Sequence, residues 1–414
     1  MSSPDAGLPA VDPQFVVNAL SALVDVPSPT GSELACAEHM VETFKSLGMD
    51  GQVQTFAPDR ANAVGVLRGT GGGRHLLLTG HMDTSYSGKE PGLEGPGYRP
   101  KAVIDGDILT GLGAANMKCG LAAALGAAHA LQSAGSRLKG DLIIAGVAGE
   151  IEKTPVDDYQ GQEYEGYGVG ARYLVSHGIT ADAAIVGEST SFRVSLGHLG
   201  SVWLRINVHG DLLHTAKNTS GDLTHAVLEA MAVVQCIEDW IPGYQARNEF
   251  MATKCGVTVG AVRAGNPTRI SRTPQTCTLY LDVRYPPGVK AMEVKHEVGE
   301  LLRTLQKSRP RLRFDLDTYM VAAPALLDES EPLVDVVRKA STQVLGGDRG
   351  CVCGVVVVDS KHLIDAGIPT INFGVPRPDP NADKVKAGES IRISDVVKLA
   401  EIYTATAIDF CNAS

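Results

Sequence analysis

The spacing of apolar positions along the first two hundred residues predicts helices and strands in alternation. Apolar residues recur every three to four positions in residues 13–26 and 31–49, as expected of amphipathic helices. Nearly continuous apolar runs, typical of strands covered on both faces of a sheet, occur in "RHLLLTGHMDT", "GDLIIAGVAGE" and "ADAAIVGES". Helical patterns follow in residues 117–135 and 169–178. This part of the chain therefore predicts an α/β fold, with helices on both faces of a mixed sheet.

From about residue 200 the order of elements changes. Strand patterns are found in residues 201–210, 255–265, 276–286 and 311–320, and helical patterns in residues 223–240 and 291–308. The resulting βαββαβ order is that of a ferredoxin-like unit. The α/β pattern then resumes with residues 332–346, 368–374 and 393–408. We therefore expect one domain made of residues 1–198 and 321–414, interrupted by an inserted domain of residues 199–320.

Length and composition fit this division and exclude several classes of protein. A chain of 414 residues is long for a single core. Its net charge of −10 argues against nucleic acid and anionic membranes as partners. No apolar run approaches the 18 or so residues of a membrane span. The eight cysteines are scattered, and "MSSPDAGLPAVDPQFVVNAL" lacks the pattern of a secretory signal, so a cytoplasmic protein with free thiols is expected.

Candidate chemistry gathers where the predicted apolar strands end. His81 and Asp83 are two residues apart at the end of the first run, so both side chains leave the same face. A carboxylate that orients a histidine is typical of a metal ligand and its supporting partner. Glu150 and Glu188 end the second and third runs, and carboxylates at the ends of buried strands require a metal ion or a proton.

The motifs GHMDT, G-x-G-x-x-N-M-K, a strand-end Glu, GE and "GIPTINFG" occur in this order, with the βαββαβ insertion before the last. In order and spacing they resemble the dinuclear zinc peptidase and deacylase family, which includes acetylornithine deacetylase, succinyl-diaminopimelate desuccinylase and glutamate carboxypeptidase. The resemblance covers nearly the whole chain. It implies that His81 and Glu188 bind the first metal, that Asp83 orients His81, and that Glu150 is the catalytic base.

The chain departs from the family pattern at every ligand of the second metal. Asn116 stands where the resemblance implies an aspartate that bridges two metals, and Ile151 replaces a glutamate ligand. Val385 stands where a final histidine is expected. We therefore expect one divalent ion per subunit, Mn or Zn, bound by His81, Asn116 and Glu188. Glu152 remains a candidate replacement ligand, and a relative that binds no metal is the alternative.

The resemblance also assigns roles in the inserted domain, which it implies to be a lid and dimerisation domain. His214 matches a histidine that reaches the active site of the neighbouring subunit, so a homodimer is expected. Arg284 matches an arginine linked to substrate carboxylates. Arg269 and Arg272 replace an asparagine-containing turn and are further candidates for binding an acidic small molecule, although a solvated loop explains them equally well.

Three functions agree with these residues. The leading hypothesis is hydrolytic deamination of an aryl amine of the 5-nitroanthranilate type, because such a substrate stabilises its own developing charge and needs less help from a single metal. The tyrosine-rich segment 153–169 fits an aromatic ligand without proving one. The alternative is an N-acyl-amino-acid deacylase or a dipeptidase or carboxypeptidase. The third possibility is a binding protein without catalysis.

Overall fold

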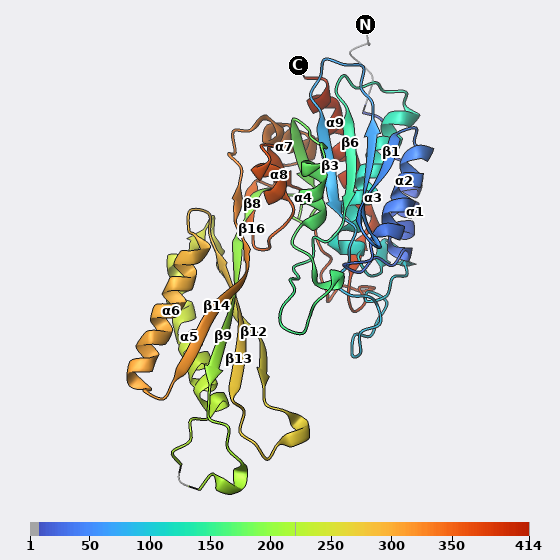
Figure 1. Cartoon of the computed structure of the whole chain (residues 1–414). Helices are drawn as coiled ribbons and strands as arrows, with labels where there is room; N and C mark the ends of the chain where they lie inside the picture. Colours follow the sequence, from blue (N-terminus) through green and yellow to red (C-terminus); the bar gives the residue numbers. More distant parts are fainter. Residues whose placement is uncertain (1–7, 220, 414) are drawn as a thin grey trace. The chain divides into compact units, whose positions relative to one another are not determined.

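A computed structural model describes residues 8–219 and 221–413, which divide into two compact units (Figure 1). The first unit comprises the described residues up to Gly197, Leu327–Val352 and those from Val358 onward. The second unit comprises His198–Leu326 and the short segment Cys353–Val357. The first seven residues, on which the expectation of a missing secretory signal partly depends, lie outside the described part of the chain.

The first unit is built around a mixed sheet whose centre is parallel, as predicted. Strand β3 (Leu76–His81) lies between β6 (Leu142–Val147) and β7 (Ala183–Val186), and all three run in the same direction. Strand β17 (Thr370–Asn372) extends the parallel part beside β7. The remaining strands of this sheet in the first unit are β1 (Asp50–Ala57), β2 (Arg60–Leu67) and β8 (Val194–His198). The short strand β15 (Ala325–Leu326) is assigned to the second unit, and β16 (Cys351–Gly354) contains the boundary between Val352 and Cys353.

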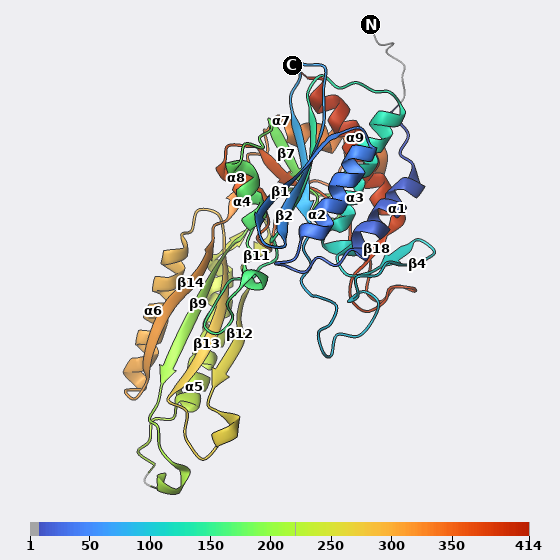
Figure 2. The same ribbon diagram turned by 45° about the vertical axis from the view of Figure 1, so that its right-hand side comes forward.

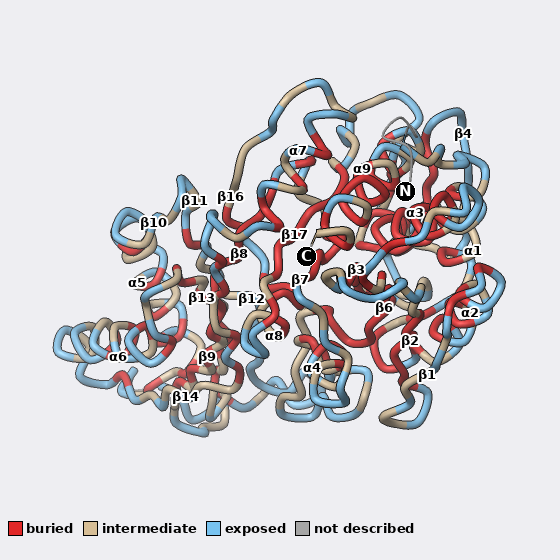
Figure 3. The backbone as a smooth tube through the Cα atoms, turned by 90° about the horizontal axis from the view of Figure 1, so that it is seen from above, coloured by how far each residue is buried: buried red, intermediate tan, exposed pale blue. Residues whose placement is uncertain are grey.

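Helices cover both faces of this sheet. One face is packed by α1 (Pro13–Asp25), α2 (Leu34–Ser46), α3 (Cys119–Ser133), α7 (Pro332–Leu345) and α9 (Ile393–Cys411). The other face is packed by α4 (Val169–Ser176) and α8 (Ser360–Asp365). The central strands are buried between these layers, as the red tube in Figure 3 shows. Leu76 and Leu78 of β3 belong to the first core and Leu77 to the second, which explains why the strand is apolar throughout.

Several short elements of the first unit were not predicted. Strands β4 (Val103–Asp105), β5 (Ile108–Thr110) and β18 (Ser390–Arg392) form a separate small sheet, visible near α1 in Figure 2. Two single turns of helix, η1 (Ala114–Lys118) and η2 (Gln162–Tyr164), also belong to this unit. Elements of three to five residues are too short to show a hydrophobic period, so the sequence pattern does not reveal them.

The second unit has the predicted ferredoxin-like order. Its elements are β9 (Gly200–His209), α5 (Ala226–Arg247), β12 (Val257–Ala264), β13 (Thr276–Tyr285), α6 (Ala291–Ser308) and β14 (Arg313–Ala322). The four strands pair antiparallel in the order β12-β13-β9-β14. Alternate residues of β9 (Val202, Leu204, Ile206 and Val208) are buried beneath the two helices. Short additions are β10 (Glu249–Phe250), β11 (Thr253–Lys254), η3 (Thr215–Lys217) and η4 (Pro267–Arg269).

None of the helices in residues 8–219 and 221–413 combines the length and the apolar character needed to span a bilayer.

Candidate metal centre

The three parallel strands at the centre of the first unit bring the predicted site residues to one edge. His81 is the last residue of β3, Glu150 follows the end of β6, and Glu188 follows the end of β7. Because neighbouring parallel strands end at the same edge of a sheet, these residues meet although they are far apart in the sequence. The structure thus brings together the histidine and both glutamates that strand-end spacing predicts.

His81, Glu150 and Glu188 form a compact cluster of potential metal ligands. One ligand atom from each residue lies within 4.8 Å of the other two. His81 Nε2 is 3.3 Å from Glu188 Oε1 and 3.6 Å from Glu150 Oε2. The His81 side chain is completely buried, and both glutamates are only 8% exposed. Two carboxylates and an imidazole in this arrangement suit a divalent cation.

The hydrogen bonds of His81 leave one ring nitrogen free for a metal ion. Its Nδ1 lies 2.8 Å from the backbone oxygen of Asp83, so a protonated Nδ1 donates to that carbonyl. Its Nε2 has no hydrogen-bond partner among the described residues, although the atom is buried. A buried nitrogen lone pair that faces two carboxylates is costly unless a cation or a proton occupies the cluster. The residues present therefore fit a divalent metal ion.

Asp83 fixes the backbone that carries Glu150. Its Oδ1 accepts a hydrogen bond of 3.0 Å from the N–H of Glu150, and its Oδ2 accepts one of 3.2 Å from that of Ile151. Thr30 Oγ1 donates a further bond of 2.9 Å to Oδ2. Its carboxylate is 3.5 Å from His81 Nδ1, beyond the closer carbonyl contact. Asp83 thus orients His81 mainly through its backbone oxygen and holds the turn at Glu150 with its carboxylate.

Electrostatic interactions within the cluster shift its ionisation. Burial raises the pKa of Glu150 well above its ordinary value, and the charge of Glu188 adds to this effect while that of His81 opposes it. Burial by itself lowers the pKa of His81, but the charge of Glu150 and the nearby carboxylates of Asp83 and Glu188 outweigh this effect, so the pKa of His81 is raised. The excess of buried negative charge favours binding of a cation.

Asn116 lies in η1, which packs against the strands that carry His81 and Glu188. A Cβ atom built on Gly80 would lie 2.0 Å from Met117 Cε, and one on Gly187 would lie 2.9 Å from it. The side chain of Met117 thus fills the space beside the residues that precede His81 and Glu188. The N–H of Asn116 donates to Glu389 Oε2 at 2.9 Å. These contacts place Asn116 beside the cluster, while its role as a ligand remains a prediction.

The positions at which the chain departs from the family pattern contribute no acidic side chain to the cluster of His81, Glu150 and Glu188 among the described residues. Ile151 is buried and bonds Asp83 only through its backbone N–H. Glu152, the candidate replacement, is not part of the cluster of His81, Glu150 and Glu188.

The other predicted site residues belong to the second unit. His214 precedes η3, where its Nδ1 accepts a hydrogen bond of 3.2 Å from the N–H of Ala216. A β-bridge joins His214 to Arg272, so these two predicted residues are neighbours. Arg269 ends η4 and is exposed. Arg284 on β13 pairs with Asp282 in its own strand, with Nη2 2.8 Å from Oδ2.

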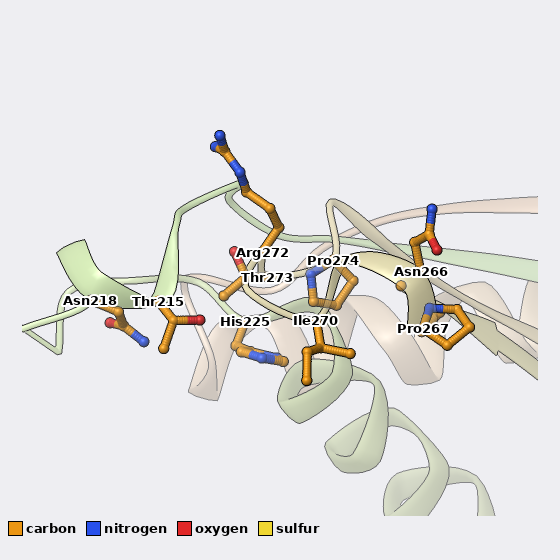
Figure 4. Close-up of a pocket in the computed structure, with 11 residues that line it drawn as sticks. Thr215, Asn218, His225, Asn266, Pro267, Ile270, Arg272, Thr273 and Pro274 are labelled. Atoms are coloured by element: carbon orange, nitrogen blue, oxygen red, sulfur yellow. The ribbon is translucent and has the colours of Figure 1, made fainter.

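A surface hollow of about 660 Å³ in the second unit is lined by Arg272 and by sequence neighbours of His214 and Arg269, while Arg284 on β13 is not among its lining residues. Thr215, His225 and Arg272 contribute polar groups to its wall. Figure 4 shows the side chain of Arg272 extending away from those of His225 and Ile270. Sequence reasoning did not single out His225, because a histidine that precedes a helix carries no signal of its own.

Two acidic residues of the first unit were also missed. Glu389 Oε2 accepts hydrogen bonds from Ala115 and Asn116, and so holds the start of η1. Asp359 is 1% exposed, and burial raises its pKa to about 7, with His81 opposing and Asp83 and Glu188 adding to the shift. The run "VVVVDS" before α8 has the apolar-strand-then-carboxylate pattern that marked Glu150 and Glu188, and this was the signal available for Asp359.

Comparison with known proteins decides the family. The model for peptidase family M20/M25/M40 matches residues 77–409. The chain belongs to this family. Its members are hydrolases that depend on divalent metal ions, so the protein is a metal-dependent hydrolase, which confirms the resemblance drawn from the motifs.

Curated relatives match this family member over nearly its whole length. An N-formyl-4-amino-5-aminomethyl-2-methylpyrimidine deformylase from Halalkalibacterium halodurans is 25% identical over an alignment of 416 positions, which covers 93% of this chain and 90% of the relative. A succinyl-diaminopimelate desuccinylase from Hahella chejuensis is 23% identical over 393 residues, which cover 92% of this chain and 93% of the relative.

Solved structures share the fold at low sequence identity. A tripeptidase from Staphylococcus aureus superposes with a TM-score of 0.73 at 18% identity, covering 97% of this chain and 99% of that chain. Human carnosine dipeptidase 1 superposes with a TM-score of 0.74 at 12% identity, covering 96% of both chains. These similarities confirm the predicted α/β fold with a mixed sheet.

Proposed function

We propose that the protein hydrolyses the amide C–N bond of a small N-acylated substrate that carries a carboxylate. The cluster of His81, Glu150 and Glu188 at the ends of three parallel strands carries this proposal. The names of the curated relatives, a deformylase and desuccinylases, describe removal of an acyl group. Nothing among these relatives supports deamination of an aryl amine, so acyl-group hydrolysis replaces it as the leading hypothesis.

In this proposal the protein residues position water and move a proton. A divalent ion held by His81, Asn116 and Glu188 would supply Lewis-acid polarisation of the acyl group and would favour ionisation of water. Glu150 accepts a proton from water as the water oxygen bonds to the acyl carbon. The electron pair of the C–N bond leaves with nitrogen, which takes that proton from Glu150. The products are a carboxylate and an amine.

The position of Glu150 fits this role. Asp83 holds the backbone N–H groups of Glu150 and Ile151, so the base is fixed relative to His81. Burial raises the pKa of Glu150, and the positive charge of a bound cation would oppose this shift, so that the carboxylate is ionised and able to accept a proton.

The reaction is tested with purified protein loaded with Mn²⁺ or Zn²⁺ and a panel of N-formyl, N-acetyl and N-succinyl amino acids, dipeptides and 5-nitroanthranilate. We expect stoichiometric carboxylate and amine from an acylated substrate. Glu150→Gln should lower kcat at least ~100-fold, the loss typical of a missing general base. Release of ammonia from the anthranilate, without acyl cleavage, would restore the aryl-amine hypothesis.

We further propose that each subunit holds one divalent ion, bound by His81, Asn116 and Glu188. Ile151 and Val385 offer no ligand atom from their side chains, and the amide of Asn116 replaces an acidic group. Elemental analysis of the wild type should give one metal per subunit, and Asn116→Asp should retain at least one. Two tightly bound ions in the wild type would contradict this count.

We also propose a homodimer in which His214 completes the partner's active site and Arg269, Arg272 and Arg284 recognise the substrate carboxylate. Glu150→Gln and His214→Ala should each be inactive alone. Mixing the two variants after dissociation should restore about a quarter of wild-type activity, since a mixed dimer has one site with both residues intact. No recovery in a mixture shown to contain mixed dimers would contradict this arrangement.

A further inference from the structure

Asp359 is a buried carboxylate that none of the functions above employs. Its side chain is 1% exposed, and neither carboxylate oxygen has a hydrogen-bond partner among the described residues. It precedes α8 but does not cap that helix with its side chain. A buried, unpartnered carboxylate is costly for a folded protein, so its retention at this position requires a compensating group.

Backbone contacts place Asp359 next to the segment that carries Glu150. A Cβ atom on Gly168 would lie 2.7 Å from Asp359 Oδ1, so the carboxylate packs directly on this glycine. The N–H of Gly168 in turn donates to the backbone oxygen of Gly149 at 2.8 Å. The carboxylate is therefore separated from the residue before Glu150 by a single glycine and one hydrogen bond.

The surroundings of Asp359 favour a small cation as the compensating group. The nearby charged groups include the carboxylates of Asp83, Glu150 and Glu188 together with His81 and Arg172. The exposed Arg172 makes no hydrogen bond to Asp359. The ring of His362 and the carboxylate of Asp359 both pack on Gly168, because a Cβ atom built on this glycine would lie within 2.7 Å of each side chain.

We propose that Asp359, which lies outside the cluster of His81, Glu150 and Glu188, adds negative charge behind Glu150 and so helps the metal centre to retain the divalent ion. This inference rests on the metal dependence in the proposed function but not on the substrate. It predicts two opposite effects of removing the charge. Asp359→Asn weakens binding of the ion, and it leaves the metal-free protein as stable as the wild type or more stable, because an uncompensated buried charge is removed.

The test uses the full chain, stripped of metal and titrated with Mn²⁺ or Zn²⁺ by calorimetry, with thermal melts of the metal-free and metal-loaded forms. We expect Asp359→Asn to raise the metal Kd at least ~10-fold and to reduce the metal-induced rise in Tm. Asp365→Asn is the matched control, because Asp365 lies on the same helix but its side chain is 61% exposed and pairs with Lys361. It should bind the ion like the wild type.

A wild-type Kd in Asp359→Asn would overturn the inference. A metal-free variant that is less stable than the wild type, or fails to fold, would also overturn it, because Asp359 would then have a structural role. The measurements need no substrate. A protein that binds metal through Asp359 but cleaves no acylated substrate would refute the proposed reaction alone.

Discussion

The imidazole of His362 on α8 is kept neutral because it is buried against the segment before α4. Burial lowers its pKa to about 4, and the nearby Arg172 and Lys361 charges act in the same direction. Its Nε2 lies 3.1 Å from the backbone oxygen of Tyr167, so a neutral ring protonated on Nε2 donates a hydrogen bond there. This bond helps to fix the turn at Gly168, next to Asp359.

This environment makes the stability of the protein depend on pH in a defined window. Because the folded pKa is about 4 and the ordinary value is 6.5, the unfolded chain binds more protons than the folded one between these values. His362 therefore contributes a loss of stability as pH falls from 6.5 towards 4. At ~1.4 kcal/mol per pKa unit, its full contribution is roughly 3 kcal/mol.

The measurement is the free energy of unfolding in urea as a function of pH for the wild type and His362→Gln. The variant should show a smaller decrease between pH 6.5 and 4, since glutamine does not titrate. His75→Gln is a control, because His75 is 48% exposed. Parallel pH profiles for the wild type and His362→Gln would show that His362 does not contribute to the slope.

At the scale of elements, the buried side chain of Arg60 joins β2 to Glu33 at the start of α2 and to the loop that follows Glu150. Arg60 and Glu33 have fully buried side chains and lie 2.8 Å apart between Nη2 and Oε1. Arg60 Nη1 also donates to the backbone oxygen of Glu165 at 2.9 Å, and its guanidinium packs on Gly149. The tyrosine-rich loop is thus held near its end by a side chain from β2, which lies between β1 and β6 in the sheet.

Arg60→Met should lower the free energy of unfolding by roughly 3–5 kcal/mol, because Glu33 would be left as an uncompensated buried charge. Arg68→Met is a matched control, because Arg68 directly follows the last residue of β2. Arg68 also binds two carboxylates, but its side chain is 64% exposed, so its loss should cost at most ~1 kcal/mol. Equal losses for the two variants in urea unfolding would contradict this account.

Much of the fold could be predicted because its central elements are long and strongly patterned. Strands β3 and β6 are apolar on both faces, and in β9 buried residues alternate with partly exposed ones, so the sequence pattern predicts which residues are buried. Strand β18 has three residues and depends on pairing with β5, a contact across 280 positions that no local pattern reports.

The candidate site divides in the same way. His81, Glu150 and Glu188 could be predicted because each stands at the end of a recognisable strand, and parallel strands bring their ends together. The environment of Asp359 could not be predicted, because it depends on the tertiary contact between Gly168 and the start of α8. The pairing of His214 with Arg272 likewise arises from two loops that share no periodic pattern.

At the scale of the whole molecule, the two units have separate hydrophobic cores. The cores of the first unit include Leu78 and Leu77 of β3, and that of the second includes Leu204 and Val298, which join β9 to α6. All three members of the metal cluster belong to the first unit. Units with separate cores can unfold in separate steps, and a ligand stabilises only the unit that binds it.

We therefore expect calorimetry of the metal-free protein to show two thermal transitions, of which added Mn²⁺ or Zn²⁺ raises only one. With free metal at 100 times Kd, the first unit gains about 2.7 kcal/mol, which is a shift of several degrees. His81→Ala should abolish this shift and leave the other transition unchanged. A fragment of residues 198–326 should melt at the metal-insensitive temperature. A single transition that moves as a whole with added metal would instead show that the two cores unfold as one cooperative unit.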